Sequence, residues 1–200
     1  MLEVSLNGFT DVPPGKVANI ATYLEMTEAP ELKPSKANGL TLEPMDPPSL
    51  TRYRALFEDV GADWLWFSRL TLDEDVLKAA IENPAFEIFA LRKEGRDVGL
   101  LELDVRDPAN IELAYFGVVQ SEVGTGAGHF LMNAAIERAF SHHKTRRFFV
   151  HTCTMDHPAA LSFYMKSGFT PYKRAIEIAD DPRLTGHIGC HLGRHHPIIE

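Results

Sequence analysis

The segment from Asn110 to His142 constrains this chain more than any other, because its residue pattern changes period at a run of glycines. Up to Val119 the residues are mostly β-branched, aromatic or small, which is typical of a buried or half-buried strand. From Gly128 onward apolar residues recur every three or four positions, which predicts an amphipathic helix. The segment therefore predicts a strand, a glycine-rich turn and a long helix.

The turn between strand and helix contains three closely spaced glycines. Glycine allows positive φ and lets a ligand approach without a Cβ in the way. Because the turn opens a helix, unpaired N–H groups and the positive end of the helix dipole point outward together. This arrangement predicts an anion site suited to a phosphate or pyrophosphate, although such a turn can also be a simple connection. The residues concerned are Gly124, Thr125, Gly126, Ala127, Gly128 and His129.

Two common phosphate-binding fingerprints do not fit this spacing. A G-x-G-x-x-G dinucleotide fingerprint that starts at Gly124 ends on His129, and one that starts at Gly126 ends on Leu131. A P-loop needs Gly-Lys followed by Ser or Thr, which the turn lacks. A nucleotide-binding protein that uses the same glycine turn in another way is a further alternative.

Length and composition indicate an ordinary globular protein. Its 200 residues suffice for one domain with a sizeable core. A formal net charge of −8 argues against nucleic acid as a partner and is compatible with a cationic amine substrate. No apolar run approaches the roughly 20 residues of a membrane span and the N-terminus lacks a signal pattern, so we expect no membrane association and a cytoplasmic location. Cys153 and Cys190 are expected to be free thiols.

The patterning divides the chain into three parts. Residues 1–38 are expected to form an N-terminal extension, made of a strand and a linker. The strand, Lys16–Met26, is expected to place Ala18, Ile20, Thr22, Leu24 and Met26 on one face. Residues 39–179 are expected to form the main domain, and residues 180–200 a tail rich in His, Gly and Pro to which no secondary structure is assigned.

Within residues 39–179 the pattern predicts a strand, two helices, three strands, a helix, a strand, a helix and a strand. An aromatic cluster, Trp64, Trp66 and Phe67, is expected to fill the core beneath the helical pair rather than to line a ligand site. The strands are expected at Leu40–Pro44, Phe86–Arg92, Val98–Asp104, Ile111–Val119, Arg147–Thr152 and Phe169–Ile178. The first helix is expected after Pro47-Pro48, with Ser49 or Thr51 as its cap, and the others at Asp73–Ile81, from Gly128, and from His157 to Gly168.

This order of elements, together with two local motifs, resembles the GCN5-related N-acetyltransferase (GNAT) superfamily over residues 40–179. The first motif is the glycine turn. The second is the segment from Ala160 to Phe169, which matches the family's A-x-x-x-Y-x-x-x-G-F ending at every fixed position. The resemblance implies an α/β (α+β) fold, a mixed, twisted central β-sheet flanked by helices. Two central parallel strands, Ile111–Val119 and Arg147–Thr152, would splay apart to hold acetyl-CoA.

The resemblance also implies which groups bind the coenzyme. Strand backbone near Val118 and Val119 would hold the pantetheine arm, the amides from Gly124 to His129 would hold the pyrophosphate, and Phe163 would lie beside them. Val123 stands where the family usually has Gln or Arg, but that position contributes mainly backbone, so we expect binding to survive. His157 stands where many members have a helix-capping Asn.

The activity that the resemblance implies is acetyl transfer to an amine by direct attack in a ternary complex, which needs a base and an acid. Glu112 is the expected base, because its fourteen-residue separation from Gly126 matches the catalytic glutamate of the histone-acetyltransferase branch. The alternative for Glu112 is an outward-facing residue on an exposed sheet face. Tyr164 is the expected acid, and its alternative is a buried packing residue. Candidate substrate contacts are Tyr115, His151, Asp156 and His157, with a histidine as an alternative base.

Other reactive residues fit less well. Cys153 has no base assigned to it, so we expect direct transfer rather than a covalent relay. The histidines of the tail and Cys190 match no zinc spacing, so no metal is expected. The expected partners are acetyl-CoA, as cosubstrate, and an amine acceptor that is a small molecule or a protein, with a homodimer left open. The alternative is a non-catalytic sensor or interaction module that binds acyl-CoA.

Overall fold

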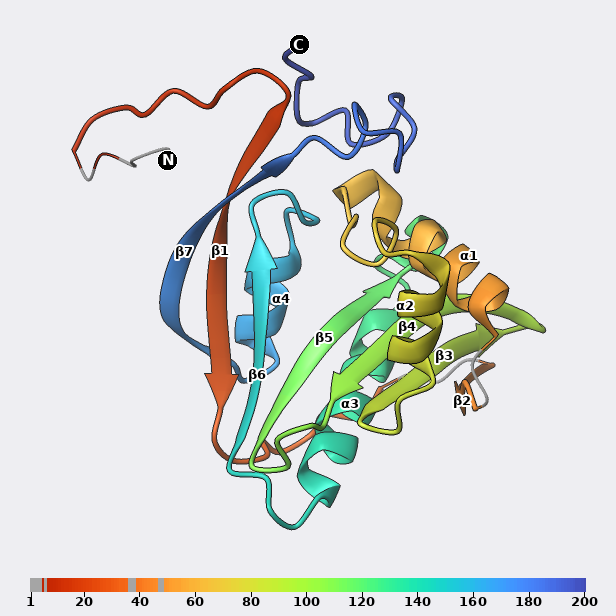
Figure 1. Cartoon of the computed structure of the whole chain (residues 1–200). Helices are drawn as coiled ribbons and strands as arrows, with labels where there is room; N and C mark the ends of the chain where they lie inside the picture. Colours follow the sequence, from red (N-terminus) through yellow and green to blue (C-terminus); the bar gives the residue numbers. More distant parts are fainter. Residues whose placement is uncertain (1–4, 6, 36–38, 47–48) are drawn as a thin grey trace.

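The computed structural model of the chain describes residues 5, 7–35, 39–46 and 49–200. At its centre is a seven-stranded sheet in the order β2-β3-β4-β5-β6-β1-β7 (Figure 1). The pair β5–β6 is parallel and the others are antiparallel, which confirms the predicted mixed sheet. The strands are Lys16–Met26 (β1), Leu40–Pro44 (β2), Phe86–Lys93 (β3), Arg96–Asp104 (β4), Asn110–Val118 (β5), Arg147–Cys153 (β6) and Thr170–Asp180 (β7).

Two pairs of helices cover opposite faces of the sheet (Figure 1). Helices α1 and α2 pack on one face, where Tyr53 and Phe57 contact a cluster that includes Leu100. Helices α3 and α4 pack on the other, where Leu131 joins a cluster with Phe148. The helices are Leu50–Gly61 (α1), Glu74–Ile81 (α2), Ala127–Ser141 (α3) and Ala160–Lys166 (α4), with short 3-10 turns at Ala62–Trp64 and Gln120–Glu122.

The ends of two helices show how local chemistry sets the fold. Ser49 caps α1, because its Oγ accepts a hydrogen bond from the Arg52 N–H at 3.4 Å, as the sequence predicts. The Pro47-Pro48 pair before it lies outside the described residues. The helix expected to start at His157 begins instead at Ala160. Residues 157–159 form a turn in which the Ala159 N–H donates to His157 Nδ1 at 3.1 Å.

Strand β1 lies between β6 and β7 and pairs antiparallel with both. The strand expected within residues 1–38 therefore belongs to the same sheet as the strands of residues 39–179. Its buried face near the start is the opposite of the predicted one: Val17 and Asn19 are buried, whereas Ile20 is 45% exposed. Alternation was predicted correctly, but its phase was wrong there, because a cavity and the C-terminal tail cover the side on which Val17 lies. Residues 36–38 of the expected linker lie outside the described residues.

The tail, residues 181–200, is packed around one buried ion pair. Asp181 and Arg183 are 2% and 3% exposed, and their side chains form an ion pair at 2.7 Å. Arg183 Nη1 also donates to the carbonyl oxygens of Gly193 and His196, which ties the loops of the tail together. Ile188 packs in a cluster with Val17, Leu65 and Met155. The tail consequently covers the end of the sheet where β1 begins (Figure 1).

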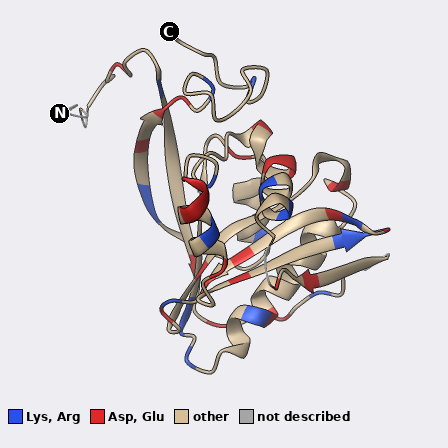
Figure 2. Ribbon diagram, turned by 45° about the vertical axis from the view of Figure 1, so that its right-hand side comes forward, with Lys and Arg blue, Asp and Glu red and all other residues tan. Residues whose placement is uncertain are grey.

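Charged residues of both signs are interspersed over the strands and helices (Figure 2). No helix in the described part of the chain is long and apolar enough to cross a membrane.

Candidate functional site

The central parallel strands are paired at one end only. Strands β5 and β6 pair at Asn110 with Arg147, Ile111 with Phe148, and Glu112 with Phe149. Beyond Glu112 the two strands diverge (Figure 1). Strand β4 still pairs with β5 as far as Val118 and β1 still pairs with β6 as far as Cys153, so each strand remains fixed on its outer side. The predicted V-shaped gap is therefore a rigid feature of the sheet.

A cavity of about 720 Å³ occupies this gap and extends over the neighbouring loops. Its size falls within the usual range for small-molecule and cofactor sites. The "turn half" of the cavity is the part lined by Val118, Val123, Gly124, Gly126, Gly128, His129 and Phe163. The "aromatic half" is the part lined by Trp64, Trp66, Phe67, Tyr115, His151, Cys153, Asp156 and the pair Asn19 and Glu177.

The glycine turn opens onto the cavity. Gly124 and Gly126 have φ of 81° and 98°, and a Cβ built on either would meet nothing within 4 Å. Gly126 is the N-cap of α3 and has no side chain to satisfy the first amides. Because Gly128 and His129 belong to the first turn of α3, their N–H groups have no acceptor four residues earlier within the helix. The turn therefore presents main-chain donors, and the space in front of them suits an anion.

The other residues of the turn hold its shape. Thr125 Oγ1 donates to the Glu122 carbonyl at 2.9 Å, and the Glu122 carboxylate accepts a hydrogen bond from Lys93 Nζ at 2.9 Å. The hydrogen bond from Lys93, together with one from Thr125 Oγ1 to the same carboxylate, lowers the pKa of Glu122, with Lys93 as the main cause. Thr125 and buried Ala127 are not part of the cavity lining, whereas their neighbours Gly124, Gly126, Gly128 and His129 are. Hydrogen bonds to Glu122 therefore hold the turn on one side, and its other side faces the cavity.

Strand β5 presents Val118 to the cavity, whereas both backbone groups of Val119 form hydrogen bonds within the protein. The Val119 N–H donates to the Val98 carbonyl, and the Val119 carbonyl accepts from the Glu122 N–H, both at 2.9 Å. Across the gap, the ring of Phe163 from α4 stacks on Phe116 at a centroid distance of 5.7 Å. The backbone of Val118 and the Phe163 ring therefore border the path from the glycine turn into the gap.

Tyr164 follows Phe163 on α4 and also lines the cavity, although the residue is only 7% exposed. Its ring lies 6.0 Å from that of Phe116, in an aromatic group. Burial raises the pKa of Tyr164, and the nearby Asp156 carboxylate adds to the effect. The hydroxyl is consequently protonated over the physiological pH range and is available as a donor.

Glu112 and His151 lie together where the strands separate. His151 Nδ1 is 3.5 Å from Glu112 Oε1, and the Tyr23 ring packs on the imidazole at 5.3 Å. His151 lines the cavity, whereas Glu112 is at the last position where β5 pairs with β6 and is not part of the lining. The Glu112 contact raises the pKa of His151 despite partial burial. The imidazole therefore stands between the Glu112 carboxylate and the cavity.

Asp156 acts as a hub for hydrogen bonds. Its carboxylate accepts from Thr152 Oγ1 and the Cys153 N–H, both at 2.7 Å, and from Trp66 Nε1 at 3.1 Å. Burial, Asp156 and Glu177 together raise the pKa of Cys153 to about 12. Cys153 is accordingly a neutral thiol, which is a poor nucleophile at neutral pH.

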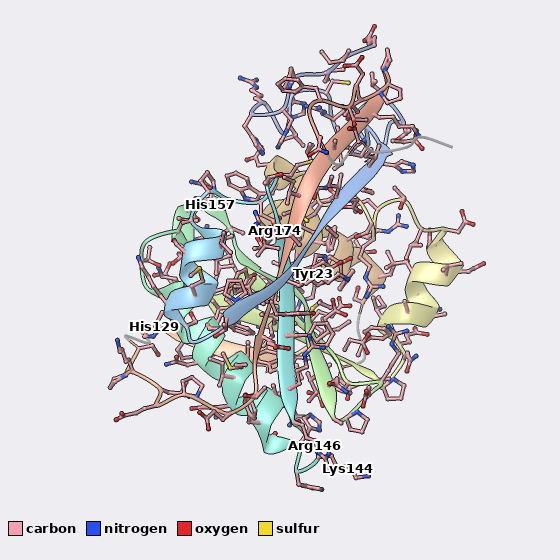
Figure 3. The ribbon with its side chains drawn as sticks, turned by 90° about the vertical axis from the view of Figure 1, so that its left-hand side faces the viewer. Tyr23, His129, Lys144, Arg146, His157 and Arg174 are labelled. Atoms are coloured by element: carbon pink, nitrogen blue, oxygen red, sulfur yellow. The ribbon has the colours of Figure 1, made fainter. Side chains whose placement is uncertain are left out.

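The aromatic cluster after α1 differs from its expected role. Trp64, Trp66 and Phe67 all line the cavity, although Trp66 also packs on Phe57 at 5.5 Å. Trp64 contacts the imidazoles of His157 and His195, at 4.9 Å and 5.4 Å. His157 and His129, which lie above and below α4 in Figure 3, both line the cavity. The tail, through His195, thus helps to position a wall of the aromatic half.

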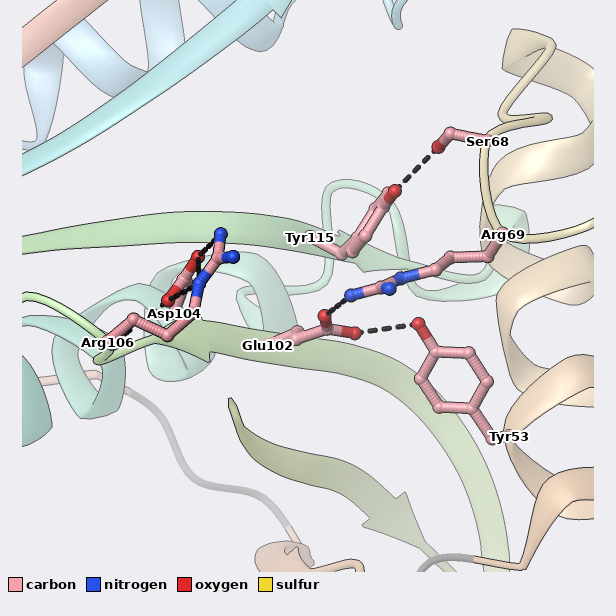
Figure 4. Close-up of polar contacts among 7 residues, drawn as sticks. All are labelled: Tyr53, Ser68, Arg69, Glu102, Asp104, Arg106 and Tyr115. Carbon is pink, nitrogen blue, oxygen red and sulfur yellow. Dashed lines mark hydrogen bonds and ion pairs between the residues drawn. The ribbon is translucent and has the colours of Figure 1, made fainter. Parts of the chain in front are cut away.

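A buried network missing from the sequence prediction supports this wall (Figure 4). The Glu102 carboxylate accepts hydrogen bonds from the Tyr53 hydroxyl at 2.6 Å and from Arg69. The Arg69 guanidinium lies over the Tyr115 ring, whose hydroxyl is 2.6 Å from Ser68 Oγ. These contacts fix the loop after α1 over the sheet. One signal was present in the sequence: a glutamate within an apolar strand needs a buried partner.

Asn19 and Glu177 are further cavity residues that the sequence analysis did not identify. They face each other on β1 and β7, and Asn19 Nδ2 donates to Glu177 Oε2 at 2.8 Å. Asn and Glu are both unfavourable in apolar strands, which is the signal that could have marked them. Among the described residues, no three His, Cys, Asp or Glu side chains are grouped as a metal site requires.

The sequence and the site were compared with known proteins. A model of the Acetyltransferase (GNAT) family matches residues 53–169. This chain belongs to the GNAT family. GNAT proteins use acetyl-CoA to transfer acetyl groups. A search of curated proteins found no match.

Many solved structures share the GNAT fold of this chain. A GCN5-related N-acetyltransferase from Sphaerobacter thermophilus has a TM-score of 0.58 at 13% identity, with 84% of this chain and 53% of that chain covered. A GNAT family acetyltransferase from Elizabethkingia anophelis with acetyl-CoA bound has a TM-score of 0.52 at 15% identity, with coverages of 68% and 79%.

An aminoglycoside acetyltransferase, meta-AAC0020, from an uncultured soil metagenomic sample, in complex with sisomicin, has a TM-score of 0.51 at 20% identity, with coverages of 66% and 88%. Identities this low establish the fold alone. The chain also spans only about half of the Sphaerobacter structure, at 53% of its length.

Proposed function

We propose that this GNAT protein is an N-acetyltransferase in which an amine in the aromatic half attacks acetyl-CoA directly. The observation that supports this most is that one cavity joins an open glycine turn, a pair of splayed parallel strands, a histidine and a protonated tyrosine. The first three features suit a coenzyme and a base, and the fourth suits an acid.

The turn half fits the coenzyme. The N–H groups of Gly126, Gly128 and His129 would bind the pyrophosphate, and the space found in front of Gly124 and Gly126 would admit it. Backbone groups of Val118, exposed by the divergence of β5 and β6, would hold the pantetheine arm. The Phe163 ring would pack beside that arm.

In the aromatic half, His151 would act as the base and Glu112 as its positioning residue. His151 removes a proton from the acceptor ammonium, directly or through one water, and Glu112 stabilises the imidazolium that results. The neutral amine nitrogen then bonds to the acetyl carbon while the carbon–sulfur bond breaks. Tyr164 donates its hydroxyl proton to the departing sulfur, and the excess proton on the newly acylated nitrogen returns to the Tyr164 phenolate, directly or through water, which leaves a neutral amide, free coenzyme A and the tyrosine restored. This assignment keeps both residues of the sequence prediction but makes Glu112 act through a histidine.

The state of Cys153 supports direct attack. A covalent relay through this residue would need a thiolate, but its pKa is raised to about 12. The Asp156 carboxylate beside it accepts hydrogen bonds and repels a thiolate, so it does not activate Cys153. The acetyl group therefore has no competent protein nucleophile at this position.

Two measurements test the proposal. Isothermal titration should show acetyl-CoA binding, and an acceptor screen that follows free thiol release should show turnover with amines. Tyr164→Phe should lower kcat by about 10- to 100-fold with little change in acetyl-CoA affinity, because it removes the acid but keeps the ring. Tyr172→Phe is the matched control, since Tyr172 is exposed and lies outside the cavity lining.

Absence of acetyl-CoA binding would refute the proposal as a whole. Binding without turnover over a broad panel of amines would instead select the non-catalytic acyl-CoA sensor. Equal rates for Tyr164→Phe and the wild type would remove the acid role while leaving the reaction in place.

A further inference from the structure

The charged side chains that line the cavity are unbalanced in sign. Among the described residues its lining includes the carboxylates of Glu122, Asp156 and Glu177 but no lysine or arginine. Glu122 is paired with Lys93, and Asp156 accepts three hydrogen bonds. Glu177 has no ion-pair partner among the described residues, and its one side-chain hydrogen bond comes from Asn19. Glu177 is therefore the carboxylate of the cavity that remains available to a ligand.

Asn19 holds this carboxylate in place from a buried position. The residue is 4% exposed, lies on the cavity wall, and donates from Nδ2 to Glu177 Oε2. Because an ionised carboxylate can only accept, this bond fixes which end of the amide faces Glu177. The other end, Oδ1, accepts from no described residue. A buried carbonyl oxygen without a donor is costly, so the presence of an asparagine here is explained by the bond from its Nδ2, which holds the Glu177 carboxylate at the cavity wall.

The pair lies at a distance from the proposed reaction centre. Asn19 pairs with Glu177 across β1 and β7, and β7 is two strands from β6, which carries His151. With neighbouring strands about 4.8 Å apart, Glu177 is about 10 Å across the sheet from β6. The reacting nitrogen must be close to His151 and Tyr164, so it cannot also contact Glu177.

An aromatic side chain accompanies the pair. Phe67 lines the cavity and packs on the cluster that contains Val17, which is two positions from Asn19 on the same face of β1. An ammonium group suits the Glu177 carboxylate, because it brings three N–H donors and a positive charge.

We propose that Asn19 and Glu177 form a subsite for a second cationic group of the acceptor. The acceptor class is then a diamine or related compound whose second ammonium or guanidinium is joined to the reacting amine by an apolar spacer of at least about 10 Å. The Glu177 carboxylate accepts hydrogen bonds from this second group, while Asn19 holds that carboxylate in place through its Nδ2. The inference rests on the proposed function for the identity of the first amine, but the subsite itself is a matter of binding.

The test compares ligands that differ in one charge. Isothermal titration of the full chain, saturated with coenzyme A, would measure 1,8-diaminooctane against octylamine, with 1,4-diaminobutane as the short control. The long diamine should bind about 10- to 100-fold tighter than octylamine, because it gains charge-assisted hydrogen bonds. The short diamine cannot span the distance and should bind no better than octylamine.

Two variants assign the effect to the pair. Glu177→Gln and Asn19→Leu should each bring the affinity for 1,8-diaminooctane close to that for octylamine. Asp180→Asn is the matched control: it removes the same charge from β7, but Asp180 is exposed, pairs with Lys16 and lies outside the cavity lining, so the preference should persist. Because Glu177 is on the exposed edge strand, Glu177→Gln tests the subsite even where Asn19→Leu fails to fold.

Equal affinities for the two long ligands, or loss of the preference in Asp180→Asn as well, would overturn the subsite. The outcome is separable from that of the proposed function. Diamine preference without thiol release would keep the subsite and refute the transferase. Turnover of amines without diamine preference would keep the transferase and refute the subsite.

Discussion

The two halves of the cavity are built in different ways. The turn half comes mainly from one continuous segment, β5 to α3, and it offers backbone amides at glycines. The aromatic half is assembled from side chains of β1, the loop after α1, β6 and β7, and the tail supports it. Backbone groups of a local turn tolerate distant changes, whereas a wall made of distant side chains does not. Coenzyme affinity and acceptor affinity should therefore respond separately to substitution.

The largest separation is expected from Arg183→Met. This change leaves Asp181 buried without its partner, which typically costs about 3–5 kcal/mol. The tail should lose hydrogen-exchange protection, and amine affinity should fall because Trp64 loses its contact with His195. Acetyl-CoA affinity should hold. Loss of both affinities, or a fully protected tail, would contradict the division into halves.

The control for Arg183→Met is Lys16→Met, which breaks an exposed pair with Asp180 and should cost less than about 1 kcal/mol.

The stability that the Asp181–Arg183 pair gives to the tail should decrease as the pH falls. Hydrogen bonds from Arg183 lower the pKa of Asp181, so their stabilisation is present above the ordinary carboxyl pKa and is lost as the pH falls through the lowered one. The tail should loosen in acid before the sheet does.

The converse separation is expected from Gly126→Val. Gly126 has a φ of 98°, and a β-branched residue in that conformation costs on the order of 1–3 kcal/mol and crowds the amides. Acetyl-CoA affinity should fall about 10- to 100-fold, while binding of 1,8-diaminooctane persists. Gly95→Val is the matched control: Gly95 has a φ of 77° in the β3–β4 hairpin, so the same substitution strains the backbone there but should leave coenzyme affinity intact. Equal losses in the two variants would mean that strain alone is responsible.

A smaller effect, within the aromatic half, is expected from Glu112→Gln. The Glu112 carboxylate raises the pKa of His151, so its removal should lower that pKa and shift the acid limb of the kcat profile to lower pH. The maximal rate should fall about tenfold, because the imidazolium is less stabilised. Glu25→Gln, on β1 and paired with Arg147, serves as the control. An unmoved acid limb would exclude His151 as the group that Glu112 tunes.

The smallest effect concerns stability. Asn19→Leu removes a buried oxygen that lacks a described donor, so the free energy of unfolding should stay equal or rise by about 1 kcal/mol. Chemical denaturation measures it, with Asn133→Leu as a comparison that breaks a hydrogen bond to the Lys33 carbonyl. A loss of more than about 3 kcal/mol on Asn19→Leu would show that Asn19 serves the fold rather than a ligand.

Local patterns predicted much of this molecule. The change of period at Gly124 to Gly128 and the motif ending at Gly168-Phe169 depend on residues close in sequence. The first predicted the strand, the glycine turn and the helix, and the family resemblance that both motifs support implied the mixed sheet. The contact between Asn19 and Glu177 spans 158 positions, and no local pattern specifies it. The phase of β1 was wrong for the same reason, because the tail that buries Val17 is distant in sequence. The backbone features of the turn could be predicted from the local sequence, whereas the long-range pairing of polar side chains could not.

The position of β1 has a consequence for biosynthesis. As the ribosome makes the chain, β1 emerges first, and the two strands that flank it, β6 and β7, emerge last. Until then β1 has neither of its pairing partners, because β6 and β7 are far from it in sequence. A nascent chain therefore completes the glycine turn while the opposite wall is still unformed, so an acceptor can be recognised only after β7 has been made.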